Sequence, residues 1–391
     1  MRIAVFTNCY LPLVNGVVGA VNLLRKGFIE QRHEVFIFAP KFDDYLDEEP
    51  GIYRYPAVDL TRKIKYPVAV PYSPKISKVL QNLNFDIIHS HHPFVLGPLA
   101  LKLARSKKVP IVYTFHTQYD QYTHYVPLPS GLVSWFSTNQ VRRFAQSVSQ
   151  VTTPAETARQ ILLKYGVTND IKVIPNPTDL TRFQAANGDS VKKEYGLANE
   201  KILINIGRVA PEKNLGLLLQ SFRIILAKAP QPVKLMIVGD GPALKELKEL
   251  ANELGIADKV IFTGMVNPAL VPNYLAAADL FVMTSKTEVK PLAQLEALAA
   301  GVPIVAVSAA GANDTISHGQ NGLLVAENSQ AISGGVLDLA FNSERLTGFK
   351  REALHTAESY SHVRIAGEYL RLFDQVIQRK NNSVSGSLGV F

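Results

Sequence analysis

Two glutamates eight positions apart, Glu288 and Glu296, are the residues whose type and spacing first suggest chemistry. They lie in the segment SKTEVKPLAQLEALAAG (285–301), which is otherwise largely apolar. Pro291 favours the start of a helix. A backbone N–H at the first helical position has no partner within the helix, so a proline there loses no hydrogen bond. A glycine and a second proline end the pattern, so we predict a helix over 291–300. Glu288 then precedes the helix, and Glu296 lies in its second turn.

These two carboxylates bracket a helix N-terminus, where free backbone N–H groups attract an anion. One carboxylate can accept hydrogen bonds from hydroxyls on one side of the anion, and the other from hydroxyls on the opposite side. That arrangement suits a nucleotide sugar, in which ribose and hexose flank a diphosphate. The alternative is structural: Glu288 interacts with the helix dipole, and Glu296 lies on the surface.

A second candidate anion site lies in GRVAPEKN (207–214), directly after a predicted strand. Arg208 and Lys213 place two cations in a loop that leads to a helix beginning near Asn214. An arginine can hold a phosphate through two hydrogen bonds, whereas a lysine acts as a point charge. The alternative is a solvated charged loop without a ligand.

Two loops of the N-terminal half also follow predicted strands. In YLPLVNGVVGAV (10–21), Asn15 and Gly16 open a helix, and the glycine lets the backbone approach a phosphate. In HSHHPF (89–94), three histidines could suggest a metal, but Asp86 is their only nearby acidic partner. Ligand-lining or structural histidines are therefore favoured over a metal site.

The segment FHTQYDQYTHY (115–125) follows another predicted strand and holds reactive side chains. His116 and Asp120 stand where reacting groups are expected. Tyr119 and Tyr122 offer flat walls that carry hydroxyls. The alternative for His116 is a core histidine whose hydrogen bonds are satisfied.

Short runs rich in β-branched and aromatic residues alternate with amphipathic segments, which indicates parallel sheets covered on both faces. The runs lie at 2–7, 33–40, 85–90, 109–116, 148–154 and 171–176, and again at 201–207, 233–239, 259–264, 280–285 and 302–307. Two such series predict an α/β chain of two doubly wound, Rossmann-like domains, 1–177 and 178–360. Ligands of such domains bind at the carboxyl ends of the strands, so the cleft between the domains is the expected site.

A helical pattern at 361–380 follows, and we expect it to pack back on the first domain. The tail 381–391 lacks periodicity and is expected to be flexible.

The composition is that of a globular protein: 391 residues, of which 47% are hydrophobic and 19% charged. The single cysteine, Cys9, excludes an internal disulfide and fits a reducing cytoplasm. The sequence shows neither a signal-peptide pattern nor a run of about 18 apolar residues, so we predict no spanning helix.

The net charge of +8 lies entirely in the first half. Residues 1–175 carry 20 Lys and Arg against 12 Asp and Glu, whereas residues 176–391 carry 21 of each. Such a positive field concentrates anionic partners, although a solubilising surface is the alternative. The basic and aromatic residues form no nucleic-acid-binding motif, so we predict no nucleic-acid partner.

Taken together, these segments closely resemble the retaining glycosyltransferases of family four, which have the two-domain GT-B fold. The matching segments are YLPLVNGVV, HSHHPF, YTFHTQYDQYTHY, VIPNPTDLTRF, NIGRVAPEKN, IVGDGP and TEVKPLAQLEALAAGVPIVA. They run from residue 10 to about residue 306 in the order that the family shows. The form FHTQYDQYTHY is most similar to bacterial diacylglycerol glucosyltransferases, which act at the membrane surface.

The resemblance implies a donor site in the second domain. Arg208 and Lys213 hold the donor diphosphate, Glu296 binds the ribose hydroxyls, and Glu288 binds the donor sugar. The family often has glycine where this chain has Pro291, which removes one N–H that could bind donor. The neighbouring residues complete the expected donor-binding set: Asn15, Gly239, Lys290, Pro291 and Leu292.

The resemblance also implies the reaction. Gly16 approaches the phosphates through its backbone, and His116 contacts the donor sugar near the reacting centre. Transfer retains the anomeric configuration and needs no essential metal or cofactor, and the leaving phosphate helps to deprotonate the acceptor. The expected reaction moves a hexose, glucose from UDP-glucose, to a membrane lipid such as diacylglycerol. A soluble or polyprenyl-linked acceptor, or a weakened binding module, is the alternative.

In this fold the first domain binds mainly the acceptor, so its positive charge predicts an acceptor on an anionic membrane. Lys75 and Lys78 lie in an amphipathic pattern, and Trp135 and Phe136 precede two arginines. Aromatic and basic residues suit a bilayer interface. We therefore place Tyr119, Asp120 and Tyr122 with these residues on the acceptor and membrane side. Ordinary core-facing helices are the alternative, and the expected location is the cytoplasmic face of the cell membrane.

Overall fold

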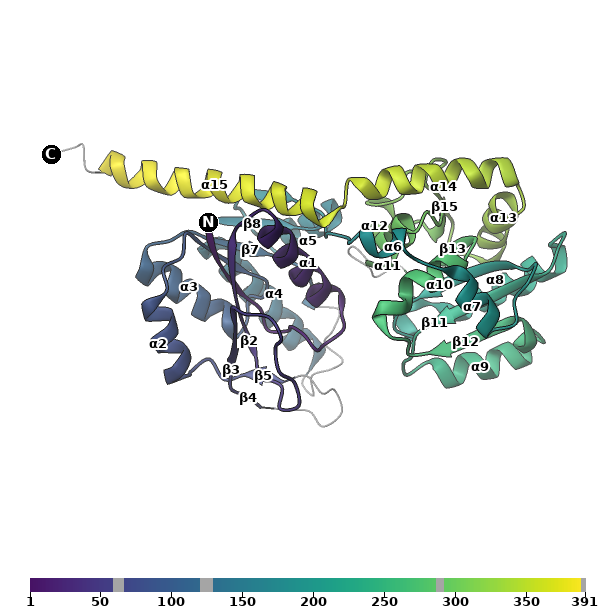
Figure 1. Cartoon of the computed structure of the whole chain (residues 1–391), viewed down its shortest axis with the longest axis horizontal. Coiled ribbons are helices and arrows are strands. Elements are labelled where there is room, and N and C mark those ends of the chain that lie inside the picture. Colours follow the sequence, from purple (N-terminus) through teal and green to yellow (C-terminus); the bar gives the residue numbers. More distant parts are fainter. Residues whose placement is uncertain (59–66, 120–128, 286–291, 388–391) are drawn as a thin grey trace. The chain divides into compact units, whose positions relative to one another are not determined.

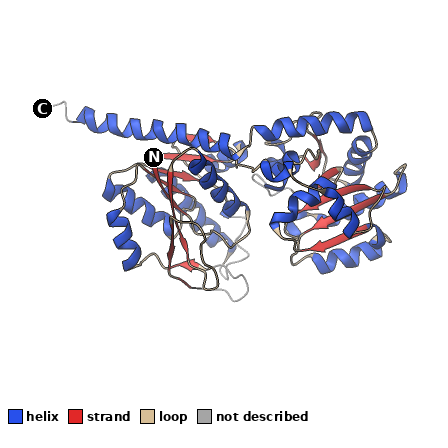
Figure 2. Ribbon diagram, viewed as in Figure 1, coloured by secondary structure: helices blue, strands red, loops and turns tan. Residues whose placement is uncertain are grey.

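The computed structural model describes residues 1–58, 67–119, 129–285 and 292–387 of the chain. The chain divides into two compact units (Figure 1). Unit 1 comprises Met1–Pro177 together with His362–Phe391, and unit 2 comprises Thr178–Ser361. Each unit is built around one parallel sheet with helices on both faces (Figure 2). The predicted α/β fold with two doubly wound sheets is thus confirmed.

The sheet of unit 1 has the strand order β3-β2-β1-β6-β7-β8-β9, and neighbouring strands are parallel. Its strands are β1 (Arg2–Phe6), β2 (Glu34–Pro40), β3 (Ile52–Tyr55), β6 (Ile87–Ser90), β7 (Ile111–Thr114), β8 (Gln150–Thr153) and β9 (Ile171–Val173). Its helices are α1 (Gly16–Glu30), α2 (Pro74–Asn82), α3 (Leu96–Lys107), α4 (Ser130–Ser147), α5 (Glu156–Lys164) and α15 (His362–Ser387). The short strands β4 (Ala57–Val58) and β5 (Val68–Ala69) form a separate antiparallel pair.

Helix α15 is part of the core of unit 1, where its Tyr369 and Phe373 pack with residues of β1 and α1. The contact with α1 is very close: a Cβ atom at Gly27 would lie 2.6 Å from both the Cβ of Ala366 and the carbonyl oxygen of His362. The sequence predicts this helix to end at residue 380 and a flexible tail to follow. The helix instead continues to Ser387, because each added residue of an existing helix gains a backbone hydrogen bond.

The sheet of unit 2 has the order β12-β11-β10-β13-β14-β15, again with parallel neighbours. Its strands are β10 (Lys201–Ile206), β11 (Val233–Val238), β12 (Val260–Gly264), β13 (Leu280–Met283), β14 (Ile304–Val307) and β15 (Gly322–Val325). Its helices include α6 (Thr181–Gln184), α7 (Gly188–Glu194), α8 (Leu215–Lys228), α9 (Leu244–Glu253), α10 (Val271–Ala277), α11 (Leu292–Ala299), α12 (Ala310–Asn313), α13 (Ser329–Ala340) and α14 (Ser343–Glu358).

Alternate residues of the unit 2 strands enter different cores. Leu203 packs with α8 and α13, whereas Ile202 and Ile204 pack with α10 and α11. This period of two places apolar side chains on both faces, as a sheet covered by helices on both sides requires.

The two ends of unit 2 meet. The backbone N–H of Thr178 donates to the carbonyl oxygen of Tyr360 at 2.7 Å, and Thr178 forms a parallel bridge with Ser361. Unit 2 therefore closes on itself at the point where the chain enters and leaves it.

In each unit the strand order reverses at one place. The chain leaves β1 for β2 and β3 on one side and returns through β6 on the other, and β10 stands in the same relation to β11 and β13. In open α/β sheets, ligands bind at the carboxyl ends of the strands beside this switch point. The loops after β1, β6, β10 and β13 are therefore the places where the fold presents side chains to a ligand.

Candidate active site

In unit 2, the loops after β10 and β13 are joined by hydrogen bonds. The Thr284 hydroxyl donates to the carbonyl oxygen of Lys213 at 2.9 Å, and the Ser285 hydroxyl donates to that of Glu212 at 3.0 Å. Thr284 and Ser285 are both buried. At the switch point of unit 2, these two hydrogen bonds thus hold the backbone of the loop after β10, which carries the two predicted phosphate-binding cations.

The two cations differ in their surroundings. The Arg208 guanidinium forms an ion pair with Glu212, and both side chains are partly exposed, at 46% and 32%. Lys213 ends the short 3₁₀ turn Pro211–Lys213 that precedes α8. An exposed ion pair contributes only about 0–1 kcal/mol, so an anionic ligand can take the guanidinium from Glu212 at little cost.

Gly239 and Gly241 pack against the loop that follows β10. A Cβ atom at Gly239 would lie 2.0 Å from the carbonyl oxygen of Gly207, and one at Gly241 would lie 2.3 Å from that of Val209. Gly239 also has a φ of +137°, which side-chain-bearing residues rarely adopt. The predicted donor-binding Gly239 therefore has a structural reason to be glycine in addition to any contact with a ligand.

Glu296 lies in the second turn of α11, as predicted, and Gly301 ends this segment with a φ of +67°. Its side chain is only 24% exposed and lies 3.9 Å from the Arg182 guanidinium. Burial raises the pKa of Glu296 to about 7, and Arg182 partly opposes that rise. Glu296 is therefore not a simple surface glutamate, because most of its side chain is buried.

Of the site residues predicted at the start of α11, Leu292 is described and is the first residue of the helix. The rest of the segment before this helix and two acceptor-side residues lie outside the described residues: Glu288, Lys290, Pro291, Asp120 and Tyr122.

In unit 1, the loop after β1 leads into α1 through Asn15. The side-chain oxygen of Asn15 accepts a hydrogen bond from the N–H of Val18 at 2.9 Å, which makes Asn15 the N-cap of the helix. Apart from its chain neighbours and its own helix backbone, no atom of the described residues lies within 4 Å of a Cβ built at Gly16, so its backbone is sterically open among them. This open backbone at a capped helix start is consistent with the approach to a phosphate that the sequence predicts.

The loops after β6 and β7 bring two histidines together. His91 Nδ1 and His116 Nε2 are 2.8 Å apart, so one ring donates a hydrogen bond to the other. Burial lowers the pKa of His116 to about 3 and that of His91 well below its usual value. Both rings are therefore neutral at physiological pH, and this hydrogen bond leaves Nδ1 of His116 for a further partner.

The sequence did not predict the contact between His91 and His116, although the pairing of β6 with β7 accounts for it. Ser90 at the end of β6 lies beside Tyr113 of β7, so the residues that follow both strands are neighbours.

Asn8 is a further residue to which the sequence analysis assigned no role. Its amide donates to the carbonyl oxygen of Phe94 at 3.0 Å and accepts from the N–H of Leu96 at 3.2 Å, which ties the loop after β1 to that after β6.

The other two histidines of the segment 89–94, His89 and His92, have protein partners. His89 Nε2 contacts the Thr114 hydroxyl at 2.7 Å, and His92 Nδ1 accepts from the N–H of Asn8 at 3.1 Å. Burial lowers the pKa of His89 to about 3 and that of His92 to about 4. Among the described residues, no cluster of three or more His, Cys, Asp or Glu side chains could hold a metal ion.

The predicted acceptor and membrane side includes exposed apolar side chains. Trp135 and Phe136 on α4 are 64% and 59% exposed, and Lys75 and Lys78 on α2 are exposed as well. The ring of Tyr119 packs edge-on against Phe94, with centroids 4.9 Å apart, and burial raises its pKa. In the described parts of the chain, no helix combines the length and apolar content that crossing a membrane requires.

The chain matches two family models in succession. Residues 14–182 match Glycosyltransferase Family 4, and residues 189–355 match Glycosyl transferases group 1. Its fold is similar to that of HepE from Anabaena, solved with UDP and glucose, with a TM-score of 0.75 at 19% identity over 96% of this chain and 100% of that one. The fold is also similar to that of sucrose-phosphate synthase from Thermosynechococcus elongatus, with a TM-score of 0.77 at 18% identity over 97% and 99%. The two parallel sheets and these likenesses define a GT-B glycosyltransferase.

Proteins with similar sequences identify the family to which this chain belongs. The chain is 35% identical to the alpha-monoglucosyldiacylglycerol synthase of Streptococcus pneumoniae over 83% of this chain and 75% of that one. It is 27% identical to the Acholeplasma laidlawii enzyme of the same name over 98% and 100%. It is 31% identical to a GDP-mannose-dependent alpha-mannosyltransferase of Corynebacterium glutamicum over 83% and 76%. The protein belongs to glycosyltransferase family 4 and is a hexosyltransferase.

Proposed function

We propose that this enzyme transfers glucose from UDP-glucose, with retention of configuration, to a diacylglycerol-type lipid at the surface of a membrane. The observation that carries this proposal is the relationship to two alpha-monoglucosyldiacylglycerol synthases, one of which aligns over 98% of this chain. The excess of 8 positive charges in residues 1–175 supports an acceptor that lies in an anionic surface.

In this proposal the donor binds at the switch point of unit 2. Arg208 and Lys213 hold the diphosphate, and Glu296 accepts hydrogen bonds from the ribose. When the bond between the anomeric carbon and the diphosphate breaks, negative charge grows on the departing UDP, and the two cations stabilise it. Gly239 lets the backbone of its loop approach the donor. The undescribed segment before α11 supplies the proposed sugar and phosphate contacts: Glu288, Lys290 and Pro291, followed by Leu292.

The acceptor hydroxyl attacks the anomeric carbon from the face that the diphosphate leaves. Its proton passes to the departing phosphate oxygen, so the new glycosidic bond keeps the configuration of the donor. Neutral His116, held by His91, contacts the donor sugar through its remaining nitrogen, and Gly16 approaches the phosphates. No step uses a metal ion, so we expect turnover to persist in the presence of a chelator.

The acceptor enters from the membrane. We propose that Trp135 and Phe136 insert at the bilayer interface, while Lys75 and Lys78 face anionic headgroups. Tyr119, with Asp120 and Tyr122, lines the path of the acceptor. The enzyme then works as a peripheral protein on the cytoplasmic face of the cell membrane.

The deciding experiment offers the purified protein several nucleotide sugars, including UDP-glucose and GDP-mannose, with diacylglycerol in neutral detergent micelles. Mass spectrometry identifies the product, and the anomeric coupling in its NMR spectrum gives the linkage. A monoglucosyl lipid with an α linkage is expected from UDP-glucose. Transfer only to soluble or polyprenyl-linked acceptors would refute the lipid assignment.

A matched variant separates an enzyme from a weakened binding module. Glu288→Ala should abolish most turnover while the protein stays folded, because the donor sugar loses a hydroxyl contact. Turnover that is unchanged in this variant would show that the proposed sugar contact is wrong. A wild-type protein that binds UDP-glucose and transfers nothing to any acceptor would be the binding module.

A further inference from the structure

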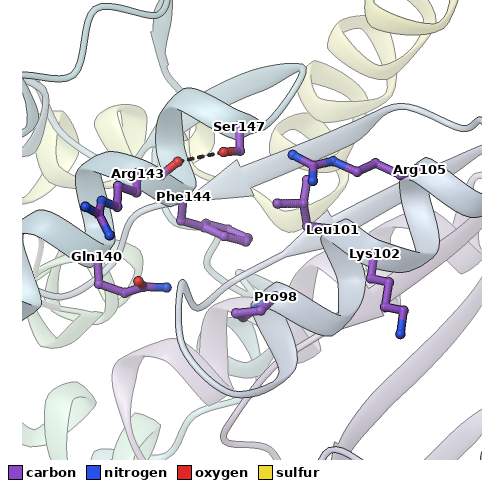
Figure 3. Close-up of a pocket in the computed structure, with 8 residues that line it drawn as sticks. All are labelled: Pro98, Leu101, Lys102, Arg105, Gln140, Arg143, Phe144 and Ser147. Carbon is purple, nitrogen blue, oxygen red and sulfur yellow. Dashed lines mark hydrogen bonds between the residues drawn. The ribbon is translucent and has the colours of Figure 1, made fainter.

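A hollow of about 360 Å³ lies between α3 and α4 of unit 1 (Figure 3). Its lining comes equally from the two helices and includes none of the residues to which the proposed reaction assigns a role. Figure 3 shows the side chains of Phe144, Leu101 and Pro98 in the space between the helices, with basic side chains from both helices around them.

The rim of the hollow carries three cations and no acid. Lys102 and Arg105 come from α3 and Arg143 from α4, and all three residues are exposed. Neither helix contains an aspartate or a glutamate. Within the described residues, no carboxylate pairs with any of the three.

Two other arginines of unit 1 have carboxylate partners. Arg54 is held by Asp47 at 2.6 Å, and Arg159 is held by Glu156 at 2.8 Å. A group of cations without a neighbouring carboxylate raises the local concentration of anions. The rim therefore has the charge that a phosphate requires.

The floor of the hollow is apolar and fixed in place. Phe144 is buried and packs edge-on against Tyr113 of β7, with ring centroids 5.0 Å apart. The amide of Gln140 donates to the carbonyl oxygen of Pro93 at 2.9 Å, which anchors α4 beside the start of α3. A ligand that fits both parts carries an anionic group beside an apolar one, as a glycerophospholipid does.

The same face of α4 continues into exposed apolar side chains. At about 100° per residue, Leu132, Phe136, Gln140, Arg143 and Ser147 fall within an arc of about 80°. Leu132 and Phe136 are 55% and 59% exposed. They lie roughly 10 Å or more along the helix from Arg143, given a rise of about 1.5 Å per residue. An apolar end next to a cationic end matches the order of acyl chains and phosphates at a bilayer surface.

We propose that the α3–α4 hollow binds the phosphate of an anionic glycerophospholipid in the bilayer. Lys102, Arg105 and Arg143 hold the phosphate, and the glycerol end of the acyl chains rests on Leu101 and Phe144. This lipid is bound and not consumed, so the site is separate from the acceptor site. It orients unit 1 on the membrane from which the acceptor is drawn.

The test measures binding of the full-length protein to vesicles without any nucleotide sugar. Vesicles of phosphatidylcholine alone are compared with vesicles that also contain phosphatidylglycerol. The wild type is expected to bind the anionic vesicles at least about tenfold more tightly, since several cations each contribute near such a surface. Arg143→Gln is expected to weaken that binding about tenfold, because a hydrogen bond to a charged group is lost.

Arg142→Gln is the matched control, because it removes the same charge from the neighbouring residue. Arg142 is exposed, does not line the hollow, and donates to the Asn139 side chain at 2.8 Å. It is expected to change vesicle binding by less than about twofold, as an exposed charge screened by salt does. Equal losses in the two variants would overturn the proposal, because they would show that charge acts diffusely. Equal binding of the wild type to both kinds of vesicle would also overturn it.

Two further measurements complete the test. Arg143→Lys should recover part of the binding, and all variants should unfold at the wild-type temperature, since these side chains are exposed. A thermal shift by inorganic phosphate that is lost in Arg143→Gln, without vesicle binding by the wild type, would assign the hollow to soluble phosphate and overturn the lipid.

Glucosyl transfer to diacylglycerol in neutral micelles separates this inference from the proposed function. Arg143→Gln should transfer at the wild-type rate there, and a loss of transfer in micelles would place Arg143 in the reaction and overturn the proposal. A wild type that transfers nothing would refute the proposed function, while the vesicle experiment would still decide the lipid site.

Discussion

Glu296→Gln is predicted to make the protein more stable at alkaline pH and less active. The native pKa of Glu296 is about 7, against a reference of 4.5. Because the folded state holds this proton more tightly than the unfolded state, stability falls as pH rises from about 4.5 to about 7. At one unit per about 1.36 kcal/mol, ionising the buried carboxylate costs about 3 kcal/mol of folding stability above pH 7.

Glutamine has nearly the same shape and cannot ionise, so it removes this cost. The variant loses a contact with Arg182, but that side chain is 36% exposed and also donates to the carbonyl oxygen of Pro268 at 2.5 Å. The loss is therefore small, about 1 kcal/mol or less. We expect the variant to match the wild type near pH 5 and to exceed it by about 2–3 kcal/mol near pH 8.5.

The assay is thermal or denaturant unfolding of wild type and variant at a series of pH values, with a probe that reports on unit 2. Donor kinetics are measured in parallel. If Glu296 binds the ribose as a carboxylate, kcat/KM for UDP-glucose falls about 10–100-fold in the variant, because a charge-assisted hydrogen bond is weakened. In the wild type the KM for the donor rises as pH falls below about 7, since protonation removes the negative charge that strengthens these hydrogen bonds. A stability difference that does not change with pH would refute the buried carboxylate, whatever the kinetics show.

Three further predictions test other features. Gly239→Ala should lower stability by about 2–4 kcal/mol, because its Cβ would lie 2.0 Å from a carbonyl oxygen, and an unchanged unfolding temperature would contradict that close contact. His91→Phe should lower kcat about tenfold or more with little change in KM, because His116 loses the ring that positions it, and His91→Gln should recover part of the rate. If His91→Phe and His91→Gln are equally slow, the ring contact does not position His116. Replacing both Trp135 and Phe136 with Ser should weaken binding to neutral vesicles about tenfold, measured by flotation, while unchanged flotation would place these side chains off the membrane.

Much of the fold could be predicted from local sequence patterns. Short apolar runs marked all six strands of unit 1 that were expected, and Gly301 marked the end of α11 because the chain needs a positive φ there. Two short strands of the sheets, β3 and β15, were not predicted. Each is an edge strand of only four residues with one parallel neighbour, and so short a run is hard to distinguish from a loop by its pattern.

The site could be predicted less completely, because its contacts depend on how strands align. The hydrogen bond between His91 and His116 exists because β6 and β7 are adjacent and in register. The contact of Glu296 with Arg182 joins residues that are remote in sequence, so it has no local signal. The spacing of Arg208 and Glu212 allowed an ion pair, but only the turn Pro211–Lys213 brings the two side chains together.

The closed ends of unit 2 and the place of α15 in the core of unit 1 have a consequence for synthesis. Unit 2 is one continuous segment whose first and last residues are hydrogen-bonded, so it has all its parts once Ser361 has left the ribosome. Unit 1 begins earlier but lacks Tyr369 and Phe373 of its core until the segment that follows unit 2 has been made. We expect protease resistance of nascent chains to appear first in the segment that is translated second, which reverses the usual order in which domains mature.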